Sequence, residues 1–326
     1  MRPPDFWERR GPASALLAPF AWIYGAAGSL RRHIVRPWKA AVPVVCVGGL
    51  TVGGAGKTPA AIAVANRLRE LGRNPHILTR GYKGRLSGPV RIDPDRHTAR
   101  DVGDEPLLLA AVAPTWVARD RVAGAKAAVA AGADILVLDD GFQNPALAKD
   151  LSLVVIDGGQ ALGNGRLLPA GPLRETLARG LGRAQAVVLV GCDRKGLAAC
   201  LPDNLTLLRA RLVPDAAGAA ALRGRRVLAF AGIGRPQKFL DSLREVGAQV
   251  AAQRLFADHH AYSAAEIEGI RAEAAKLNAV PVTTAKDAVR IPAELRAGIQ
   301  VLEAVLAFDR PEELDGLLAG LNTTPA

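Results

Sequence analysis

The chain has 326 residues and a hydrophobic fraction of 49%, which is ample for a buried core and for two domains. Its formal net charge is +11, so we expect an anionic partner, either a phosphorylated substrate, an anionic lipid surface or a nucleic acid. Only 4% of the residues are aromatic, and none of the obvious basic clusters interleaves aromatic residues as a base-stacking surface would, so no nucleic-acid partner is expected.

The first long apolar stretch covers residues 13–30 and includes Phe20 and Trp22. A secretory signal is one interpretation, but acidic residues precede the stretch and Pro19 interrupts it. A spanning helix needs about 20 apolar residues, so the stretch is marginal for one, and a helix packed on the protein's own core also stays open. An interfacial helix fits best, because arginines on both sides would meet the headgroups of an anionic membrane. Residues 1–40 are therefore expected to form a membrane-associating helical segment.

A glycine-rich loop follows the predicted buried strand 42–47 and ends in Gly-Lys-Thr. This order of strand, glycine loop and helix is typical of a phosphate-binding loop, with Lys57 for the β- and γ-phosphates and Thr58 for Mg²⁺. The full pattern has glycine where this chain has Thr51, so a plain glycine-rich turn is the alternative. The residues expected to bind the nucleotide are Thr51, Val52, Gly53, Gly54, Ala55, Gly56, Lys57 and Thr58.

The next elements continue an alternating α/β pattern. A helix is predicted over 57–71, ended by Gly72, and a strand over 75–79. The basic loop 80–85 would then lie at the carboxyl edge of a parallel sheet, where ligands bind, although an exposed solvated loop would have the same composition. The pattern predicts an α/β fold with a mostly parallel sheet.

Two charged residues in this part of the chain have both a structural and a functional interpretation. Asp104 stands just before a leucine-rich helix and is a good N-cap, and it is also a carboxylate held where it could face the phosphate site. Arg121 follows the predicted strand 113–118 and is either a ligand for a substrate phosphate or a surface charge.

A second strong signal is the apolar strand that starts at Ile135 and ends in Asp139 and Asp140. An aspartate at a strand tip, some eighty residues after Gly-Lys-Thr, is the arrangement that binds Mg²⁺ in phosphate-loop enzymes. We therefore expect Thr58, Asp139 and Asp140 to hold Mg²⁺. A strand ending in Asp-Asp-Gly is otherwise most often only a turn.

Strands are also predicted over 151–156 and 186–190, with an irregular Pro- and Gly-rich loop between them. Arg174 and Glu175 lie at the expected start of a helix after this loop. An arginine there could stabilise the charge of a transferring phosphoryl group, whereas the structural alternative is a helix-terminal ion pair.

The alanine-rich stretch near residue 217 is taken as a domain boundary, giving a nucleotide-binding domain at 41–217 and a smaller α/β domain at 218–326. The smaller domain is predicted to contain strands over 226–231 and 249–256 and a helix over 263–277. The three cysteines lack metal-ligand spacing and suit a reducing cytosol.

Taken together, the motifs resemble the tetraacyldisaccharide 4′-kinase family, and the resemblance covers nearly the whole chain. It rests on several motifs in family order, namely residues 52–59, Thr79-Arg80-Gly81-Tyr82, Gly103-Asp104-Glu105-Pro106, Asp139-Asp140-Gly141-Phe142-Gln143, Leu167-Leu168-Pro169-Ala170-Gly171, Phe230-Ala231-Gly232-Ile233-Gly234, Asp258-His259 and Thr283-Thr284-Ala285-Lys286-Asp287. Thr51 is the family's own form, which removes the defect in the loop. The chain departs from the family at Asn144, where histidine is usual, and at Gly49, where asparagine is common.

The resemblance implies an ATP- and Mg²⁺-dependent kinase that phosphorylates the 4′-hydroxyl of a tetraacylated glucosamine disaccharide 1-phosphate and gives lipid IVA. It also implies a P-loop core, an active site in the cleft between two domains, and association with the cytoplasmic face of the inner membrane. Asp104 and His259 would act as the proton-accepting pair, with Lys57 and Arg174 also catalytic. The residues expected to contact the substrate are Glu105, Arg121, Gln143 and Glu175.

Three other functions stay open on the sequence alone. A different P-loop kinase could act on a soluble substrate, and a membrane-associated P-loop ATPase or switch protein would have no small-molecule acceptor. A nucleic-acid-binding ATPase would account for the charge and would show a steep salt dependence of binding.

Overall fold

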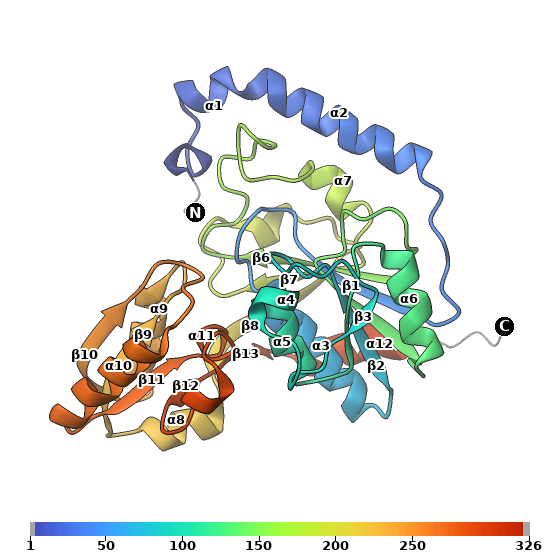
Figure 1. Ribbon diagram of the computed structural model, residues 1–326. Helices are drawn as coiled ribbons and strands as arrows, with labels where there is room; N and C mark the ends of the chain where they lie inside the picture. Colours follow the sequence, from blue (N-terminus) through green and yellow to red (C-terminus); the bar gives the residue numbers. More distant parts are fainter. Residues whose placement is uncertain (1–3, 322–326) are drawn as a thin grey trace.

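The computed structural model describes residues 4–321, which form a larger and a smaller α/β part joined side by side (Figure 1). The larger part is built on a nine-stranded sheet in the order β13-β8-β7-β6-β1-β5-β2-β4-β3, and the smaller part on a four-stranded sheet in the order β10-β9-β11-β12. The expected α/β class with a mostly parallel sheet is confirmed, because among the described strands only the edge strands β3 and β13 pair antiparallel.

The strand bounds of the larger sheet follow the apolar runs of the sequence. β1 has every residue buried and pairs with β5 and β6 on its two sides, so it is the central strand. The nine strands are β1 (Val44–Gly48), β2 (Pro75–Thr79), β3 (Val90–Arg91), β4 (Thr115–Val117), β5 (Ile135–Asp139), β6 (Leu151–Asp157), β7 (Ala186–Val190), β8 (Thr206–Pro214) and β13 (Ala304–Phe308).

Helices cover both faces of this sheet, and alternate residues of β1 serve the two cores. Val45 and Val47 pack on the side of α3 (Lys57–Glu70), α5 (Asp104–Ala110) and α12 (Pro311–Ala319), whereas Val44 and Cys46 pack on the side of α6 (Arg121–Ala130) and α7 (Leu177–Leu181). This alternation is the two-residue period of a strand buried on both faces. Shorter helical turns are α4 (Ala99–Val102) and η2 (Leu197–Cys200).

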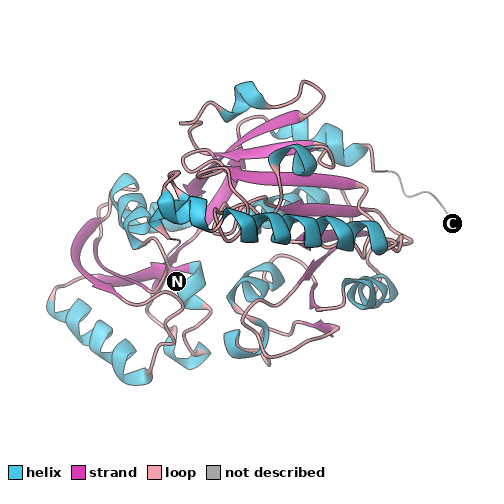
Figure 2. Cartoon of the chain, turned by 90° about the horizontal axis from the view of Figure 1, so that it is seen from above, coloured by secondary structure: helices cyan, strands magenta, loops and turns pink. Residues whose placement is uncertain are grey.

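The amino-terminal segment forms η1 (Asp5–Trp7), α1 (Pro12–Leu16) and α2 (Ala18–Ile34), and α2 runs across the larger part as its longest helix (Figures 1 and 2). One face of α2 faces the protein, where a Cβ on Gly25 would meet Leu167. Large apolar side chains on its other face are exposed, including Trp22 at 82% and Ile23 at 67%. Within residues 4–321, no helix is long and apolar enough to cross a membrane.

The four strands of the smaller sheet are all parallel and are β9 (Arg226–Ala231), β10 (Gln249–Leu255), β11 (Val280–Thr284) and β12 (Gln300–Leu302). Its helices are α8 (Ala216–Leu222), α9 (Pro236–Glu245), α10 (Ala264–Lys276) and α11 (Ala285–Ala288), with a turn at η3 (Ala293–Leu295). The predicted helix over 263–277 matches α10, whose N-cap Ser263 forms a capping box with Glu266.

The end of the chain differs from the expected range of 218–326 for the smaller domain. The chain leaves the smaller sheet after β12, β13 pairs antiparallel with β8 of the larger sheet, and Leu314 and Leu318 of α12 pack in the larger core. Residues 304–319 therefore belong to the larger part. The physical reason is that β8 is an open sheet edge next to an apolar face of α3, and the amphipathic end of the chain covers both.

Candidate active site

A large open cleft of about 2610 Å³ lies between the two parts and is lined by residues from both. Its floor contains the glycine loop from Val52 to Thr58 and the tips of β5 and β7. The smaller part contributes the turn after β9, the turn after β10 and the start of α11. All of these segments follow the carboxyl ends of parallel strands, which is where α/β sheets place ligands.

The glycine loop connects β1 to α3 as the sequence predicts. Gly56 caps α3 with a φ of 89°, a left-handed conformation that favours glycine, and α3 then begins at Lys57. The loop is tied down by the Val52 N–H, which donates to the Pro172 carbonyl at 2.9 Å. Lys57 Nζ donates to the Gly53 carbonyl at 2.9 Å, and burial lowers the pKa of this lysine. The helix start and the lysine together form a site for an anion.

The two aspartates at the tip of β5 differ in their surroundings. Asp139 is buried; its Oδ2 accepts from Thr79 Oγ1 at 3.3 Å, while its Oδ1 is buried without a hydrogen-bond partner in the described chain. Burial, and then the negative charge of Asp140, raise the pKa of Asp139 to about 7. Asp140 has a φ of 52°, so the chain turns sharply at the strand tip.

Asp139 Oδ1 is a buried carboxylate oxygen without a hydrogen-bond donor among the described residues, next to a second carboxylate. A bound cation would supply the interaction that this oxygen lacks. Residues 4–321 contain no cluster of three or more His, Cys, Asp or Glu side chains that could hold a metal alone. The hydroxyl of Thr58 and the carboxylates of the two aspartates are oxygen donors of the kind that Mg²⁺ takes together with phosphate oxygens and water.

Arg174 lies against the second aspartate. Its Nη1 and Nη2 donate to the two carboxylate oxygens of Asp140 at 2.7 and 3.1 Å, and Nη1 also donates to Gln143 Oε1 at 3.1 Å. Gln143 in turn donates to Glu175 Oε1 at 3.1 Å, and Arg183 donates to Glu175 Oε2 at 2.5 Å. Glu175 is 3% exposed and does not line the cleft, so its contacts hold Gln143 rather than a ligand.

Asp104 and His259 meet across the cleft from the two parts of the molecule. His259 Nδ1 lies 2.7 Å from Asp104 Oδ2, and Arg290 Nε donates to the same oxygen at 2.9 Å. Burial would raise the pKa of Asp104, but the hydrogen bond and charge of Arg290, followed by those of His259, outweigh it and lower the pKa. The expected N-cap role is wrong: Gly103 is the N-cap of α5 and Asp104 makes no cap hydrogen bond.

Two further charged residues from the predicted set lie in the same region. Glu105 accepts from Lys286 Nζ at 2.7 Å, which is a second contact between the parts. Arg121 is 4% exposed, so the alternative of a surface charge is wrong. Its Nε is buried without a partner in the described chain, and it lines the cleft.

Comparisons with known proteins identify the family of the chain. The family model described as tetraacyldisaccharide-1-P 4′-kinase matches residues 13–322. The chain belongs to the tetraacyldisaccharide 4′-kinase family.

Similar proteins named tetraacyldisaccharide 4′-kinase occur in Rhodospirillum centenum, at 56% identity over 98% of this chain and 97% of that protein, and in Rhodospirillum rubrum, at 53% identity over 98% and 97%. A crystal structure of the "apo" form of LpxK from Aquifex aeolicus in complex with ATP is 26% identical, covers 95% of this chain and 99% of that chain, and has a TM-score of 0.78.

The structure brings most of the residues predicted from the 4′-kinase family resemblance into this one cleft, whose lining includes Val52 to Thr58, Glu105, Arg121, Asp139, Asp140, Gln143, Arg174 and His259. Asn144, which replaces the usual histidine, also lines it, and its side chain accepts from the Ala146 N–H at 2.9 Å. Sequence reasoning missed Arg183 and Arg290, since neither lies in a phosphate-loop or strand-tip pattern.

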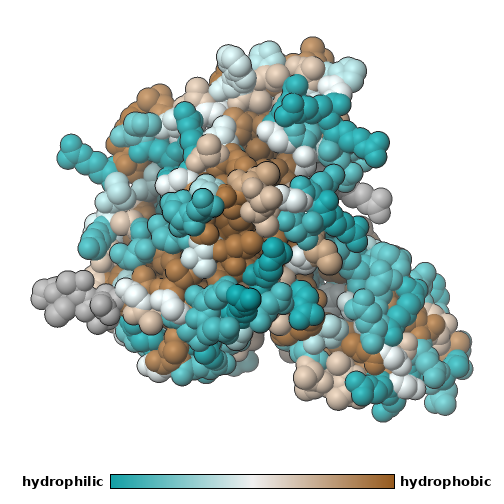
Figure 3. Space-filling model, turned by 180° about the vertical axis from the view of Figure 1, so that it is seen from behind, coloured by the Kyte–Doolittle hydropathy of each residue, from teal (hydrophilic) through white to brown (hydrophobic). Residues whose placement is uncertain are grey.

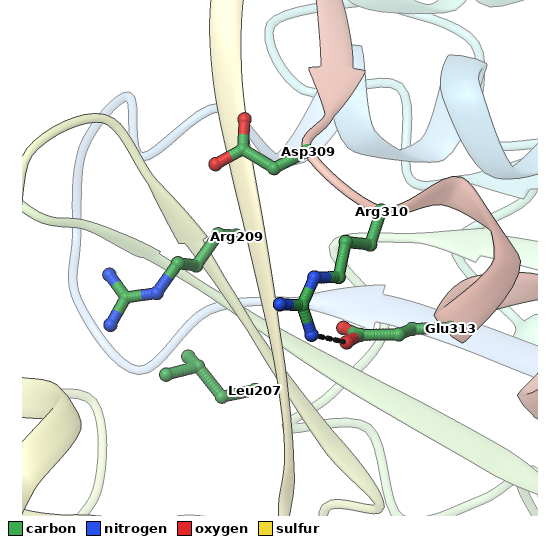
Figure 4. A pocket seen from close by; sticks show the side chains of 5 residues that line it. All are labelled: Leu207, Arg209, Asp309, Arg310 and Glu313. Carbon is green, nitrogen blue, oxygen red and sulfur yellow. Dashed lines mark hydrogen bonds and ion pairs between the residues drawn. The ribbon is translucent and has the colours of Figure 1, made fainter.

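A separate small pocket of about 290 Å³ lies beside β8 and α12 and contains mostly charged side chains (Figure 4). Arg310 donates to Glu313 at 3.1 Å, and Asp309 accepts from Arg211 at 3.1 Å. Asp309, Arg310 and Glu313 are thus already paired, and the pocket lacks the phosphate-binding features of the 4′-kinase cleft.

Proposed function

We propose that this protein transfers the γ-phosphate of ATP to the 4′-hydroxyl of a tetraacylated glucosamine disaccharide 1-phosphate, giving the 1,4′-bisphosphorylated lipid. The observation that carries the proposal is the 2.7 Å contact between His259, which lines the same cleft as the glycine loop, and the buried Asp104. A phosphate cradle and a base bound to a side chain of the same cleft are what transfer to a hydroxyl requires.

The larger part would bind ATP as a P-loop domain. Backbone N–H groups of the loop and the start of α3 would surround the phosphates, and Lys57 would exchange its Gly53 contact for a phosphate oxygen. The lysine is half-buried, so its charge would act on the phosphates with little screening by water.

Thr58, Asp139 and Asp140 would hold Mg²⁺, for which the orphaned Oδ1 of Asp139 is the supporting observation. When bound, the ion supplies positive charge against the β- and γ-phosphates. The protein's own contribution at this end is Arg174, whose guanidinium would lie beside the phosphoryl group and stabilise its charge.

At the acceptor end, Asp104 would take the proton of the 4′-hydroxyl and His259 would orient the carboxylate. The pKa of Asp104 lies below its usual range, so the group is ionised at neutral pH and ready to accept a proton late in the transfer. Its two partners come from the smaller part, so the pair is complete only when the parts are together.

The acceptor is a lipid, and we infer that α2 holds the enzyme on an anionic membrane at the cytoplasmic face of the inner membrane. Exposed apolar side chains on α2 support this, and basic residues in its last turn would meet headgroup phosphates. The view from behind shows apolar side chains gathered over the larger part, whereas the smaller part is mostly polar (Figure 3).

The deciding experiment mixes the full-length protein with γ-labelled ATP, Mg²⁺ and the tetraacyl disaccharide 1-phosphate in detergent. Transfer of label to the lipid is the expected result, and Asp104→Ala and His259→Ala should each lower kcat about 100-fold with little change in the KM for ATP. Slow ATP hydrolysis without a labelled lipid would instead indicate the P-loop ATPase or switch protein.

A further inference from the structure

Arg290 lies just after α11 in the smaller part, and its side chain is only 4% exposed. It reaches out of its own part to Asp104: Nε donates to Oδ2 at 2.9 Å, and Nη2 lies 2.8 Å from the same oxygen. Because Arg290 is buried, water screens its ion pair with the Asp104 carboxylate less than it screens an exposed ion pair. The contact between the two parts is therefore stronger than that of two surface charges at the same distance.

The smaller part fixes this guanidinium through Asp287. Arg290 Nη1 donates to Asp287 Oδ1 at 3.1 Å, and Asp287 has no exposed surface. The same Oδ1 accepts from Tyr262 Oη and from the Gly232 N–H, each at 2.8 Å, and Oδ2 accepts from Thr284 Oγ1 at 2.6 Å. Both carboxylate oxygens of Asp287 thus accept hydrogen bonds from the smaller part. Through Oδ1, Asp287 holds the end of the Arg290 guanidinium that does not contact Asp104.

The Gly232 carbonyl joins Arg290 to His259. It accepts from Arg290 Nη1 at 2.7 Å and from the His259 N–H at 3.0 Å. His259 has a φ of 64°, a conformation that a non-glycine residue keeps only when its surroundings hold it. The two residues that reach Asp104 are therefore linked to each other through the Gly232 carbonyl.

Both contacts fall on one oxygen of Asp104. His259 and Arg290 bind Oδ2, and in residues 4–321 no hydrogen bond reaches Oδ1. We propose that Arg290 is a positioning residue of the transfer reaction: together with His259 it saturates Oδ2 of Asp104, so that Oδ1 is turned to the incoming hydroxyl and receives its proton.

This inference rests on the proposed kinase function, and it assigns the proton to one atom. The hydroxyl O–H bond breaks, its oxygen bonds to the γ-phosphorus of ATP, the bond from that phosphorus to the β,γ-bridging oxygen breaks so that ADP leaves, and the proton goes to Oδ1. Arg290 touches neither the hydroxyl nor the phosphate in this scheme and acts only through Asp104.

Four charged or titratable groups lie around Asp104 and determine how its protonation depends on pH. Arg290 and His259 contact it from the smaller part, Glu105 is its neighbour on α5, and Lys286 binds Glu105. Removing the Arg290 charge leaves a buried carboxylate with His259 as its one direct partner from the smaller part. The acid limb of activity, which reports ionised Asp104, should then move to higher pH.

The test compares Arg290→Met with wild type in the lipid-phosphorylation assay across pH 3 to 8, because the lowered pKa of Asp104 places the acid limb in the acidic part of this range. We expect kcat to fall about 10- to 100-fold, the KM for ATP to stay within about threefold, and the acid limb of kcat to rise by about one pH unit. Arg290→Lys keeps a charge but not the fork of donors, so its acid limb should stay near that of wild type while kcat is still reduced. The matched control is Arg254→Met. It removes an exposed arginine of the far strand β10, which is paired with Glu273 of α10.

A double variant separates positioning from general support of the fold. If Arg290 acts through Asp104, then Arg290→Met should cost little more activity in an Asp104→Asn background, whereas independent effects would multiply. An unchanged acid limb together with multiplicative losses would overturn the proposal, even with normal wild-type transfer. If Arg290→Met melts below the assay temperature, the Arg290→Lys pair with and without Asp104→Asn gives the same comparison. Absence of transfer by the wild type would instead refute the kinase function itself.

Discussion

Arg174 donates one hydrogen bond to each carboxylate oxygen of Asp140, at 2.7 and 3.1 Å, so a cation from the loop before α7 faces the tip of β5. The pair is only part-buried, and Asp140 also lies in the field of Lys57. Burial would raise the pKa of Asp140, but the charges of Lys57 and Arg174 outweigh it and lower the pKa. An ion pair at this position keeps the carboxylate ionised and the arginine beside the phosphate site.

Removal of this guanidinium should affect the chemical step more than nucleotide binding. We expect Arg174→Ala to lower kcat about 100-fold, since one preorganised donor to a charged transition state has an effect of that order. Arg174→Lys should recover only part of it, because an ammonium group cannot make both bonds to Asp140. Steady-state phosphorylation of the lipid measures both, with the exposed Arg179→Ala as the matched control. Equal losses in Arg174→Ala and Arg179→Ala would contradict the assignment.

The raised pKa of Asp139 predicts how the stability of the metal-free protein depends on pH. The folded protein holds a proton on this carboxyl up to about pH 7, whereas the ordinary pKa of an aspartate is near 4. Between these values the folded state binds more protons than the unfolded state, so this group makes stability fall as pH rises. In EDTA, Asp139→Asn should raise the melting temperature more at pH 8 than at pH 5, while abolishing transfer. A larger gain at pH 5 would refute the shift.

The exposed face of α2 predicts a loss of membrane binding when its apolar side chains are changed. Trp22 and Ile23 are exposed by 82% and 67%, and each could bury most of its surface in a lipid boundary. At roughly 25 cal/mol per Å², the double variant Trp22→Ser/Ile23→Ser should weaken binding by tenfold or more. Sedimentation with vesicles containing anionic lipid measures this. Leu71→Ser, at an apolar site just after α3 that is 45% exposed, should bind like wild type.

The three cysteines should differ in their reaction with an alkylating reagent. Cys46 is buried in β1, and burial raises the pKa of its thiol to about 12, so it should not react in the folded protein. Cys192 and Cys200 are exposed, but only Cys192 lines the cleft. ATP should therefore slow alkylation of Cys192 and leave Cys200 unchanged, as measured by peptide mass spectrometry. Equal protection of both thiols would show that nucleotide does not occupy this end of the cleft.

Much of the larger part could be predicted because its signals are local. β2 and β7 have the predicted bounds, and β1, β5 and β6 differ from them by a residue or two, since each is an apolar run bounded by turn residues. The glycine loop and the Asp139–Asp140 tip could be found for the same reason. Carboxyl ends of parallel strands share one edge, so residues far apart in sequence were expected in one cleft.

The parts that could not be predicted depend on contacts between distant residues. The pairing of β13 with β8 is not encoded in either strand, because each has apolar residues that several sheet edges could accept. Arg290 resembles any surface arginine in sequence, and only the fold brings it to Asp104. The N-cap expected at Asp104 failed for a related reason, since Arg290 of the smaller part binds the carboxylate that would otherwise accept from the backbone N–H groups of the helix.

The return of β13 to β8 makes the smaller part an insertion between two antiparallel neighbours. The chain leaves the larger sheet after Pro214 and re-enters it at Ala304, and the two crossings are bound together where the Asp215 N–H donates to the Glu303 carbonyl at 3.0 Å. In topological terms, β8 and β13 are the two arms of a hairpin whose tip has been replaced by a whole domain. A short turn joining Pro214 to Ala304 would close that hairpin, so the larger part has the connectivity to fold as a continuous unit without the smaller part.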